Sequence, residues 1–166
     1  DDAPTEFALL KRIKEALENE LPVRSLEFSE TEQAYLKNYG LLTSKPFMFI
    51  ANVAEDFISN YEDDENYLKL KAYAEKTNSK IIGISAEIES QLAVLDDEDK
   101  QMFLDDLGVT EPGLNRLIRA TYDLLGYATY FTTGPDECRA WTFKKGMLAP
   151  ECAGIIHSDF QRGFIR

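Results

Sequence analysis

Residues 46–53 read PFMFIANV, the longest uncharged apolar run of the chain. A continuous apolar stretch of this length is typical of a strand that is buried on both faces of a parallel sheet. A second short run, IIGI at 81–84, follows a segment at 63–76 in which apolar side chains recur at helical spacing. Strand, helix and strand in this order predict a right-handed, parallel βαβ unit.

Helices and a hairpin are predicted on either side of this unit. A capping box, SETE at 29–32, opens a short helix that ends at Gly40. Aromatic and β-branched residues on both sides of a Gly-Pro-Asp turn predict a β-hairpin. The remaining predictions are helices over 5–20, 97–107, 112–125 and 150–157, hairpin strands over 127–133 and 138–144, and the beginning of a further strand at 164–165.

The composition is that of a folded, acidic protein. The 166 residues carry a net charge of −12 with 44% hydrophobic content, which argues against a protein that coats nucleic acid. The longest apolar run is far too short to cross a bilayer, and the first residues show no signal-peptide pattern. Two cysteines, Cys138 and Cys152, are too few for a disulfide scaffold and are interpreted as reduced packing residues. We therefore expect a soluble, cytoplasmic, mixed α/β protein.

Charge is distributed unevenly along the chain. Residues 87–111 carry 9 acidic and 1 basic side chain, net −8, whereas residues 112–166 carry 5 acidic and 7 basic, net +2. This change indicates a boundary near residues 110–126. The acidic run at 96–99 lacks the alternating ligands and the central glycine of a calcium loop, so it is interpreted as a solvated helix start.

Three further features do not support catalysis. Residues 108–113 place two glycines at the spacing of a phosphate-binding loop, but Leu114 and Asn115 follow where a lysine and a hydroxyl residue are required. His157, the only histidine, has no neighbours in the sequence that suit catalysis or metal binding, so a structural or exposed role is expected. Trp141 is assigned to the core of the hairpin. No catalytic residue and no metal ligand is predicted.

A candidate binding edge follows the two buried strands. The motif NVAE at 52–55 lies at the carboxyl end of the first strand, where open α/β sheets bind ligands. Asn-x-x-acid is the spacing with which GTPases hold the base, although residues 60–63 show it too in a predicted loop. The dipeptide SA at 85–86 follows the second strand, as the loop that closes over the base does in those enzymes. The predicted binding residues are Asn52, Val53, Glu55, Ser85 and Ala86.

Several segments resemble the YchF family of Obg-like ATPases, which belongs to the P-loop GTPase superfamily. They are LTSKP at 42–46 together with NVAE at 52–55, SAEIE at 85–89 and FLDDLG at 103–108. The most specific are YFTTGP at 130–135, RAWT at 139–142 and IHSDFQRGFI at 156–165. The last block resembles the start of the family's TGS domain, a β-grasp module. The resemblance extends over nearly the whole chain.

This resemblance implies a fold and its division. Residues 1–40 would be the end of a helical, coiled-coil insertion, residues 41–125 the C-terminal part of the nucleotide-binding domain, and residues 126–166 the start of the TGS domain. The expected fold class is α/β: a partial P-loop NTPase parallel βαβ sheet with flanking helices, followed by the beginning of the β-grasp module. The family's phosphate-binding loop, switch regions and magnesium site would precede this chain.

The resemblance also implies a function. The full-length protein would bind and hydrolyse ATP, and GTP less well, with Mg²⁺, and its TGS region would contact the large ribosomal subunit or RNA. No DNA or membrane partner is expected. The alternative is a non-catalytic module that binds ribosome, RNA or protein, in which the nucleotide fold is vestigial.

The predicted roles at the binding edge follow from the chemistry of the bases. An aspartate at the last position of the motif reads guanine through N1–H and the 2-amino group, whereas N1 of adenine is an acceptor that would oppose a carboxylate. The longer Glu55 can turn away, and Val53 offers an apolar contact to the base. Asn52 would order the loops and offer its amide, while Ser85 and Ala86 would supply backbone groups at the 6-position.

Overall fold

The computed structural model describes residues 3–165. Its contacts group the chain into two compact units, one that ends at Phe47 and one that begins at Met48. The expected domain boundaries after residues 40 and 125 stay predictions. Among residues 3–165, no helix combines the length and the apolar composition that crossing a membrane requires.

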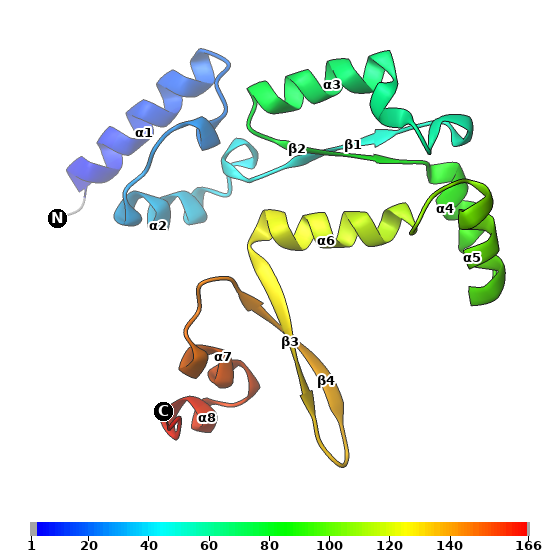
Figure 1. Ribbon diagram of the computed structural model, residues 1–166. Helices are drawn as coiled ribbons and strands as arrows, with labels where there is room; N and C mark the ends of the chain where they lie inside the picture. The colour runs from blue at the N-terminus through cyan, green and yellow to red at the C-terminus, as the bar shows by residue number, and fades with distance from the viewer. Residues whose placement is uncertain (1–2, 166) are drawn as a thin grey trace. The chain divides into compact units, whose positions relative to one another are not determined.

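The first unit is built from two helices around a small apolar core. Its elements are α1 (Ala3–Glu18), the short 3₁₀ helix η1 (Val23–Ser25), α2 (Glu30–Tyr39) and η2 (Leu42–Ser44) (Figure 1). The core consists of Leu9, Ile13 and Val23, with aromatic and aliphatic side chains of α2 packed around it. The predicted first helix is confirmed, although it ends at Glu18 rather than at residue 20.

The predicted capping box at the start of α2 is confirmed. The Ser29 hydroxyl accepts a hydrogen bond from the backbone N–H of Glu32 at 3.3 Å, and the Glu32 carboxylate accepts one from the backbone N–H of Ser29 at 2.9 Å. The second bond is the main reason why the pKa of Glu32 is lowered. Gly40 ends the helix in the left-handed conformation, with φ 61°.

The second unit begins with the predicted parallel βαβ arrangement. Strand β1 (Met48–Asn52) pairs in parallel with β2 (Lys80–Ile84), from Met48↔Lys80 to Asn52↔Ile84. The connection contains η3 (Glu55–Phe57), η4 (Tyr61–Asp63) and α3 (Glu65–Lys76). Figure 1 shows α3 and a later helix, α6, on opposite sides of the strand pair.

The prediction that β1 is buried on both faces is wrong for the described residues. Its side chains are intermediate or exposed, and Ile50 is 52% exposed. The physical reason is the packing of the helices: α3 packs against both strands, whereas α6 packs mainly against β2, so the faces of β1 are only partly covered.

Three helices follow the strand pair. They are α4 (Ala86–Leu92), which the sequence pattern did not predict, α5 (Asp97–Asp106) and α6 (Gly113–Leu125), which it did. Helices α4 and α5 bury a second core of Ile58, Ile88, Leu92 and Leu104. Gly108, between α5 and α6, has φ 68°, a conformation that glycine adopts without strain.

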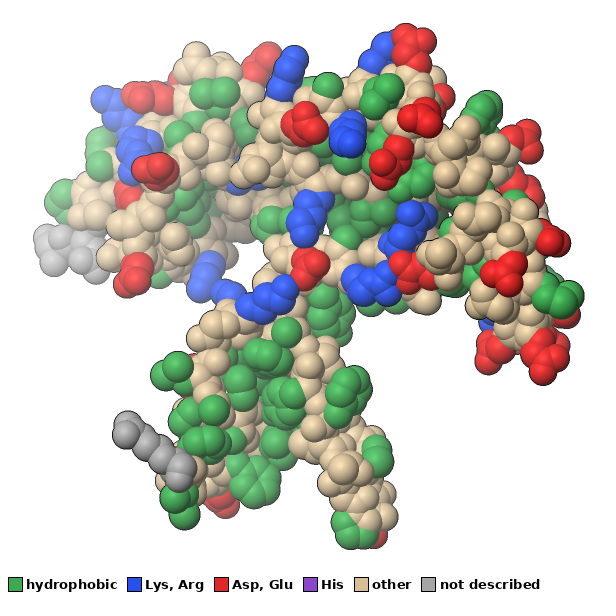
Figure 2. All heavy atoms as spheres, in the orientation of Figure 1, with side chains coloured by type: hydrophobic (Ala, Val, Ile, Leu, Met, Phe, Trp, Pro, Cys, Tyr) green, Lys and Arg blue, Asp and Glu red, His purple; other side chains and the backbone are tan. Residues whose placement is uncertain are grey.

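The last part of the chain contains the predicted hairpin and two short helices. Strands β3 (Tyr127–Thr133) and β4 (Cys138–Lys144) pair antiparallel, as predicted, and α7 (Ala149–Ile156) follows. The Tyr130 hydroxyl donates to the carbonyl oxygen of Cys152 at 2.8 Å, and burial raises the pKa of this tyrosine. Figure 2 shows hydrophobic side chains gathered over the hairpin and these helices.

The predicted strand at residues 164–165 is wrong. The described chain instead forms a further helix, α8 (Ser158–Arg162), after which residues 164–165 have no regular structure. Among residues 3–165 the strands pair only as β1 with β2 and β3 with β4, so residues 164–165 have no strand to pair with. The start of α8 is capped locally, because the Nδ1 atom of His157 accepts a hydrogen bond from the backbone N–H of Asp159 at 3.2 Å. Whether this region begins a TGS domain, and whether the strand pair is part of a P-loop fold, stay predictions.

Candidate functional site

The candidate site lies where β1 and β2 end. The two strands run in parallel with Asn52 opposite Ile84, so the segments that follow them emerge at the same edge. One further backbone hydrogen bond, from the N–H of Val53 to the carbonyl oxygen of Ile84 at 2.9 Å, extends the pairing beyond the strands. The structure thus brings the five predicted binding residues to one edge.

Asn52 joins the two segments directly. Its side-chain oxygen accepts a hydrogen bond from the backbone N–H of Ala86 at 3.0 Å. The Ala86 N–H therefore already has a hydrogen-bond partner within the protein. The amide nitrogen of Asn52 is a donor that this bond does not use. Both residues are exposed, so this contact is accessible from solvent.

The carboxylate of Glu55 forms a hydrogen bond with a residue of α4. Its Oε2 atom accepts a hydrogen bond from the side-chain amide of Gln91 at 3.3 Å. Gln91 is not among the residues predicted from the sequence, because it is 36 positions from Glu55 and no motif links the two. The bond restricts the direction in which the carboxylate can point.

Val53 and Ser85 face the interior. Val53 is partly buried and packs against the core that Ile58, Ile88 and Leu92 form. Ser85 is 2% exposed, and its hydroxyl has no hydrogen-bond partner among the described residues. A buried hydroxyl without a partner is costly and therefore uncommon. The predicted contact between Val53 and a base stays a prediction.

Helix α6 forms hydrogen bonds to the elements that carry the edge. The guanidinium of Arg116 donates to the Gly83 carbonyl oxygen at 3.0 Å and to the Tyr61 hydroxyl at 3.1 Å. At the start of α6, the Gly113 N–H donates to the Glu89 carboxylate at 2.6 Å. These contacts fix α4 and the end of β2 relative to α6.

Other chemistry-bearing residues have structural roles or lie apart. Among residues 3–165, no group of three or more His, Cys, Asp or Glu side chains is placed to hold a metal ion. His157 caps α8, which agrees with the structural role expected for it. Cys138 is exposed, so its assignment as a packing residue is wrong, whereas Cys152 is partly buried. Trp141 is half-buried on the hairpin and donates to the Thr132 hydroxyl at 2.8 Å.

The fold is therefore a helix-rich α/β arrangement with a parallel strand pair and a separate antiparallel hairpin. Residues 127–166 match the family model described as YchF-GTPase_C, "Protein of unknown function (DUF933)". The chain is 56% identical over 165 residues to the "Ribosome-binding ATPase YchF" of Bacillus subtilis and 46% identical to the protein so named from Pasteurella multocida. Each alignment covers 99% of this chain and 45% of the relative.

A solved structure agrees with these relatives. The structure titled "Structure of the Schizosaccharomyces pombe YchF GTPase" superposes with a TM-score of 0.83 and 28% sequence identity. The superposition covers 98% of this chain and 43% of that chain. The chain belongs to the YchF family, and it spans less than half the length of the relatives that it matches.

Proposed function

We propose that this chain supplies the base-recognition edge of an ATP-binding protein that acts on the ribosome in the cytoplasm. The supporting observation is the hydrogen bond between Asn52 and the Ala86 N–H at 3.0 Å, which joins the segments after two parallel strands at the edge where such sheets bind ligands. The relatives' name, ribosome-binding ATPase, agrees with this proposal.

The direction of the Glu55 carboxylate favours adenine over guanine. Guanine recognition needs a carboxylate aimed at N1–H and the 2-amino group, and adenine presents an acceptor at N1 instead. Because Gln91 draws the Glu55 carboxylate toward α4, this negative charge is kept away from the acceptor. The free amide nitrogen of Asn52 is a donor that suits an acceptor atom of the adenine ring.

The whole protein hydrolyses ATP with Mg²⁺ in this proposal. Magnesium at a nucleotide is usually held by one or two carboxylates together with the phosphates themselves. The proposal assigns the phosphate-binding loop and the magnesium site to the part of the whole protein that the family resemblance places before this chain. We predict that the chain alone hydrolyses neither ATP nor GTP, and phosphate release that persists through extensive purification would contradict this.

Paired titrations of ATP and GTP against the full-length protein test the base preference. We expect Glu55→Asp combined with Val53→Lys to shift the preference toward GTP by roughly tenfold, about 1.4 kcal/mol. The reason is that a shorter carboxylate makes two charge-assisted hydrogen bonds to guanine, worth about 1.5–3 kcal/mol each before backbone adjustments. Asp63→Glu is the matched control, because residues 60–63 have the same spacing away from the edge.

Two outcomes distinguish base recognition by the motif at 52–55 from the restraint that Gln91 places on Glu55. An unchanged ATP-to-GTP ratio in the folded double variant would mean that the motif does not read the base. Gln91→Leu tests the restraint on Glu55: we expect weaker ATP binding with GTP binding unchanged or improved. Equal loss of both nucleotides would instead assign Gln91 to folding alone.

A second candidate function is ribosome or RNA contact through the hairpin. The guanidinium of Arg139 lies 4.2 Å from the centroid of the Trp141 ring, and Phe131 is 80% exposed on the other strand. Stacked arginine and exposed aromatic rings are groups that RNA-binding surfaces use. Co-sedimentation of the chain with large ribosomal subunits tests this, with Phe131→Ser and Arg139→Gln expected to reduce it.

A further inference from the structure

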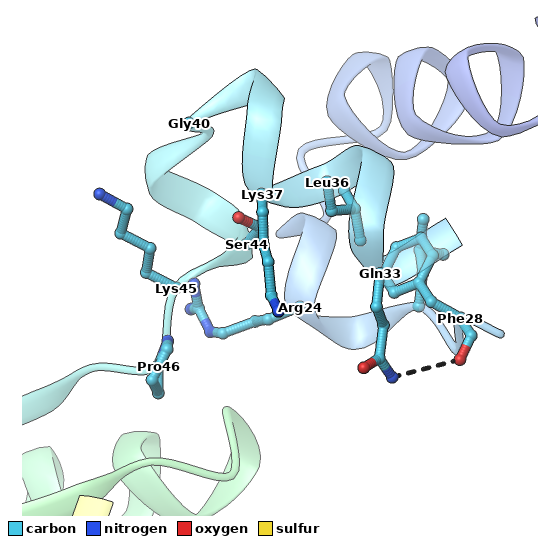
Figure 3. A pocket seen from close by; sticks show the side chains of 10 residues that line it. Arg24, Phe28, Gln33, Leu36, Lys37, Gly40, Ser44, Lys45 and Pro46 are labelled. Atoms are coloured by element: carbon cyan, nitrogen blue, oxygen red, sulfur yellow. Dashed lines mark hydrogen bonds between the residues drawn. The ribbon is translucent and has the colours of Figure 1, made fainter. Parts of the chain in front are cut away.

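A hollow of about 500 Å³ lies in the first unit, and Ser44, Lys45 and Pro46 of the LTSKP segment form part of its lining. Residues of η1, α2 and η2 and of the segments next to them line it. Figure 3 shows the side chains of Arg24, Lys37 and Ser44 bordering the same space. Its volume falls in the range of about 300–1,000 Å³ that small-molecule sites occupy.

The charge of this hollow is opposite to that of the chain. The full sequence has 30 acidic and 18 basic residues. The lining nevertheless contains three cations, Arg24, Lys37 and Lys45, and no Asp or Glu. Within residues 3–165, none of these three side chains forms an ion pair with a carboxylate. We call these three residues the cation triplet.

Arg24 is the fixed member of the triplet. Its guanidinium lies 3.9 Å from the centroid of the Phe47 ring and donates to the Thr43 carbonyl oxygen at 3.3 Å. Its Nε atom is buried with no hydrogen-bond partner among the described residues. The charge is thus held in place while part of its donor capacity stays unused.

Lys37 and Lys45 are the adaptable members. Both are exposed, and an ammonium group on a flexible stem can move toward a bound anion. The lining also contains the aliphatic side chains of Leu26, Leu36 and Pro46. The hollow therefore combines positive charge with apolar surface.

We propose that this hollow binds a small organic phosphate, with the phosphate group paired to the cation triplet and the apolar body against the aliphatic side chains of the lining. A phosphate monoester carries about −1.5 to −2 charges at pH 7, which suits three uncompensated cations better than the single charge of a carboxylate. Its oxygens accept hydrogen bonds from both guanidinium and ammonium groups.

Isothermal titration calorimetry on the 166-residue chain tests the proposal with phenyl phosphate as the probe. Inorganic phosphate lacks the apolar body, and benzoate has the ring with one negative charge. We expect phenyl phosphate to bind more tightly than either. Lys37→Gln with Lys45→Gln should weaken binding by about tenfold or more, the effect of losing a charge-assisted hydrogen bond.

The matched control removes two lysines from elsewhere in the same unit. Lys11→Gln with Lys14→Gln changes the net charge equally on α1, outside the hollow, and should leave the affinity unchanged. Circular dichroism verifies that both double variants are folded. Three results would overturn the proposal: no saturable binding of phenyl phosphate, equal affinity for benzoate, or equal loss of affinity in the control variant.

Discussion

Replacing Gly83 with alanine tests how tightly β2 is packed near its carboxyl end. Gly83 is buried, and the ring of Tyr61 lies across it. A Cβ atom added here would lie 2.8 Å from Cζ of Tyr61 and closer still to Cδ2 and Cε2. Carbon atoms in favourable contact are about 3.5–4.0 Å apart, so either the ring or the strand has to move.

The ring of Tyr61 is not free to move. Its hydroxyl accepts a hydrogen bond from Arg116 at 3.1 Å, and its ring meets that of Tyr67 edge-on, with centroids 4.9 Å apart. The same guanidinium donates to the Gly83 carbonyl oxygen at 3.0 Å. A shift of ring or strand therefore disturbs contacts on both sides of Gly83.

The expected cost combines three effects. Overpacking in a well-packed region costs about 1–3 kcal/mol, and loss of the hydrogen bond between Tyr61 and Arg116 adds about 0.5–1.5 kcal/mol. Alanine restricts the unfolded chain and returns about 0.4–1 kcal/mol. We expect the free energy of unfolding to fall by about 2 kcal/mol, which lowers the melting temperature by roughly 4–8 °C in a chain of this size.

Urea and thermal unfolding followed by circular dichroism measure this loss. Gly134→Ala is the control, because a Cβ atom there would meet its nearest neighbour, the Glu137 carbonyl oxygen, at an ordinary 3.7 Å. In a Tyr61→Ala background the ring is absent, so Gly83→Ala should cost close to nothing. Equal destabilisation by Gly83→Ala in both backgrounds would refute the packing argument.

Three further predictions concern local contacts. Ser29→Ala should lower the free energy of unfolding of the first unit by about 1 kcal/mol in urea titrations, because α2 loses its cap. The hydrogen bond that Tyr39 donates to Glu6 raises the pKa of Tyr39 from 10.0 to about 12. The stabilisation from this bond should therefore be complete below pH 10 and vanish as the pH rises through about 12. The difference in tyrosinate absorbance between the wild type and Tyr39→Phe follows this titration. The hydrogen bond from Lys145 is the main reason why the pKa of Asp123 is lowered, so this contact should be lost as the pH falls through that lowered value. Lys145→Met should raise this pKa toward its ordinary value, measured from the carboxyl resonance in NMR spectra, and the charge of Lys80 should still lower it in part.

The elements that the sequence predicts well are those with local determinants. The capping box of α2 joins residues only three positions apart, Ser29 and Glu32, so its signal lies entirely within one short segment. The hairpin strands end where predicted because a Gly-Pro-Asp turn separates two alternating segments. In both cases the contacts that stabilise the element are close in the sequence.

Helix α4 depends instead on distant residues. Ser85 precedes it without a side-chain cap, and seven residues are too few for a clear helical period. Its buried residues, Ile88 and Leu92, pack with Ile58 and Leu104 from other parts of the second unit. No local sequence pattern predicts such a helix, because it is stabilised by tertiary burial rather than by helix propensity.

At the candidate edge, too, some features follow from the local sequence and others depend on distant residues. Parallel pairing of Asn52 with Ile84 follows from the predicted βαβ unit, and it brings the five predicted residues together. The partner of Glu55 did not follow, because Gln91 reaches it only once α4 has packed against the second core. Sequence spacing thus predicts which residues meet at a strand end, whereas the direction of a side chain depends on what packs beside it.

The position of the edge depends on residues that do not belong to it. Arg116 holds the Gly83 carbonyl oxygen one residue before β2 ends, and Glu89 of α4 holds the N–H of Gly113 at the start of α6. A Cβ atom at Gly113 would lie 2.9 Å from the Glu89 carboxylate and 3.0 Å from a methyl carbon of Ile84. Alanine there would therefore disturb the carboxylate that accepts the hydrogen bond from the Gly113 N–H. This hydrogen bond connects α6 to α4, the helix that carries Gln91 and begins at the residue that Asn52 binds. Residues outside the five predicted ones therefore help to position the proposed base-recognition edge.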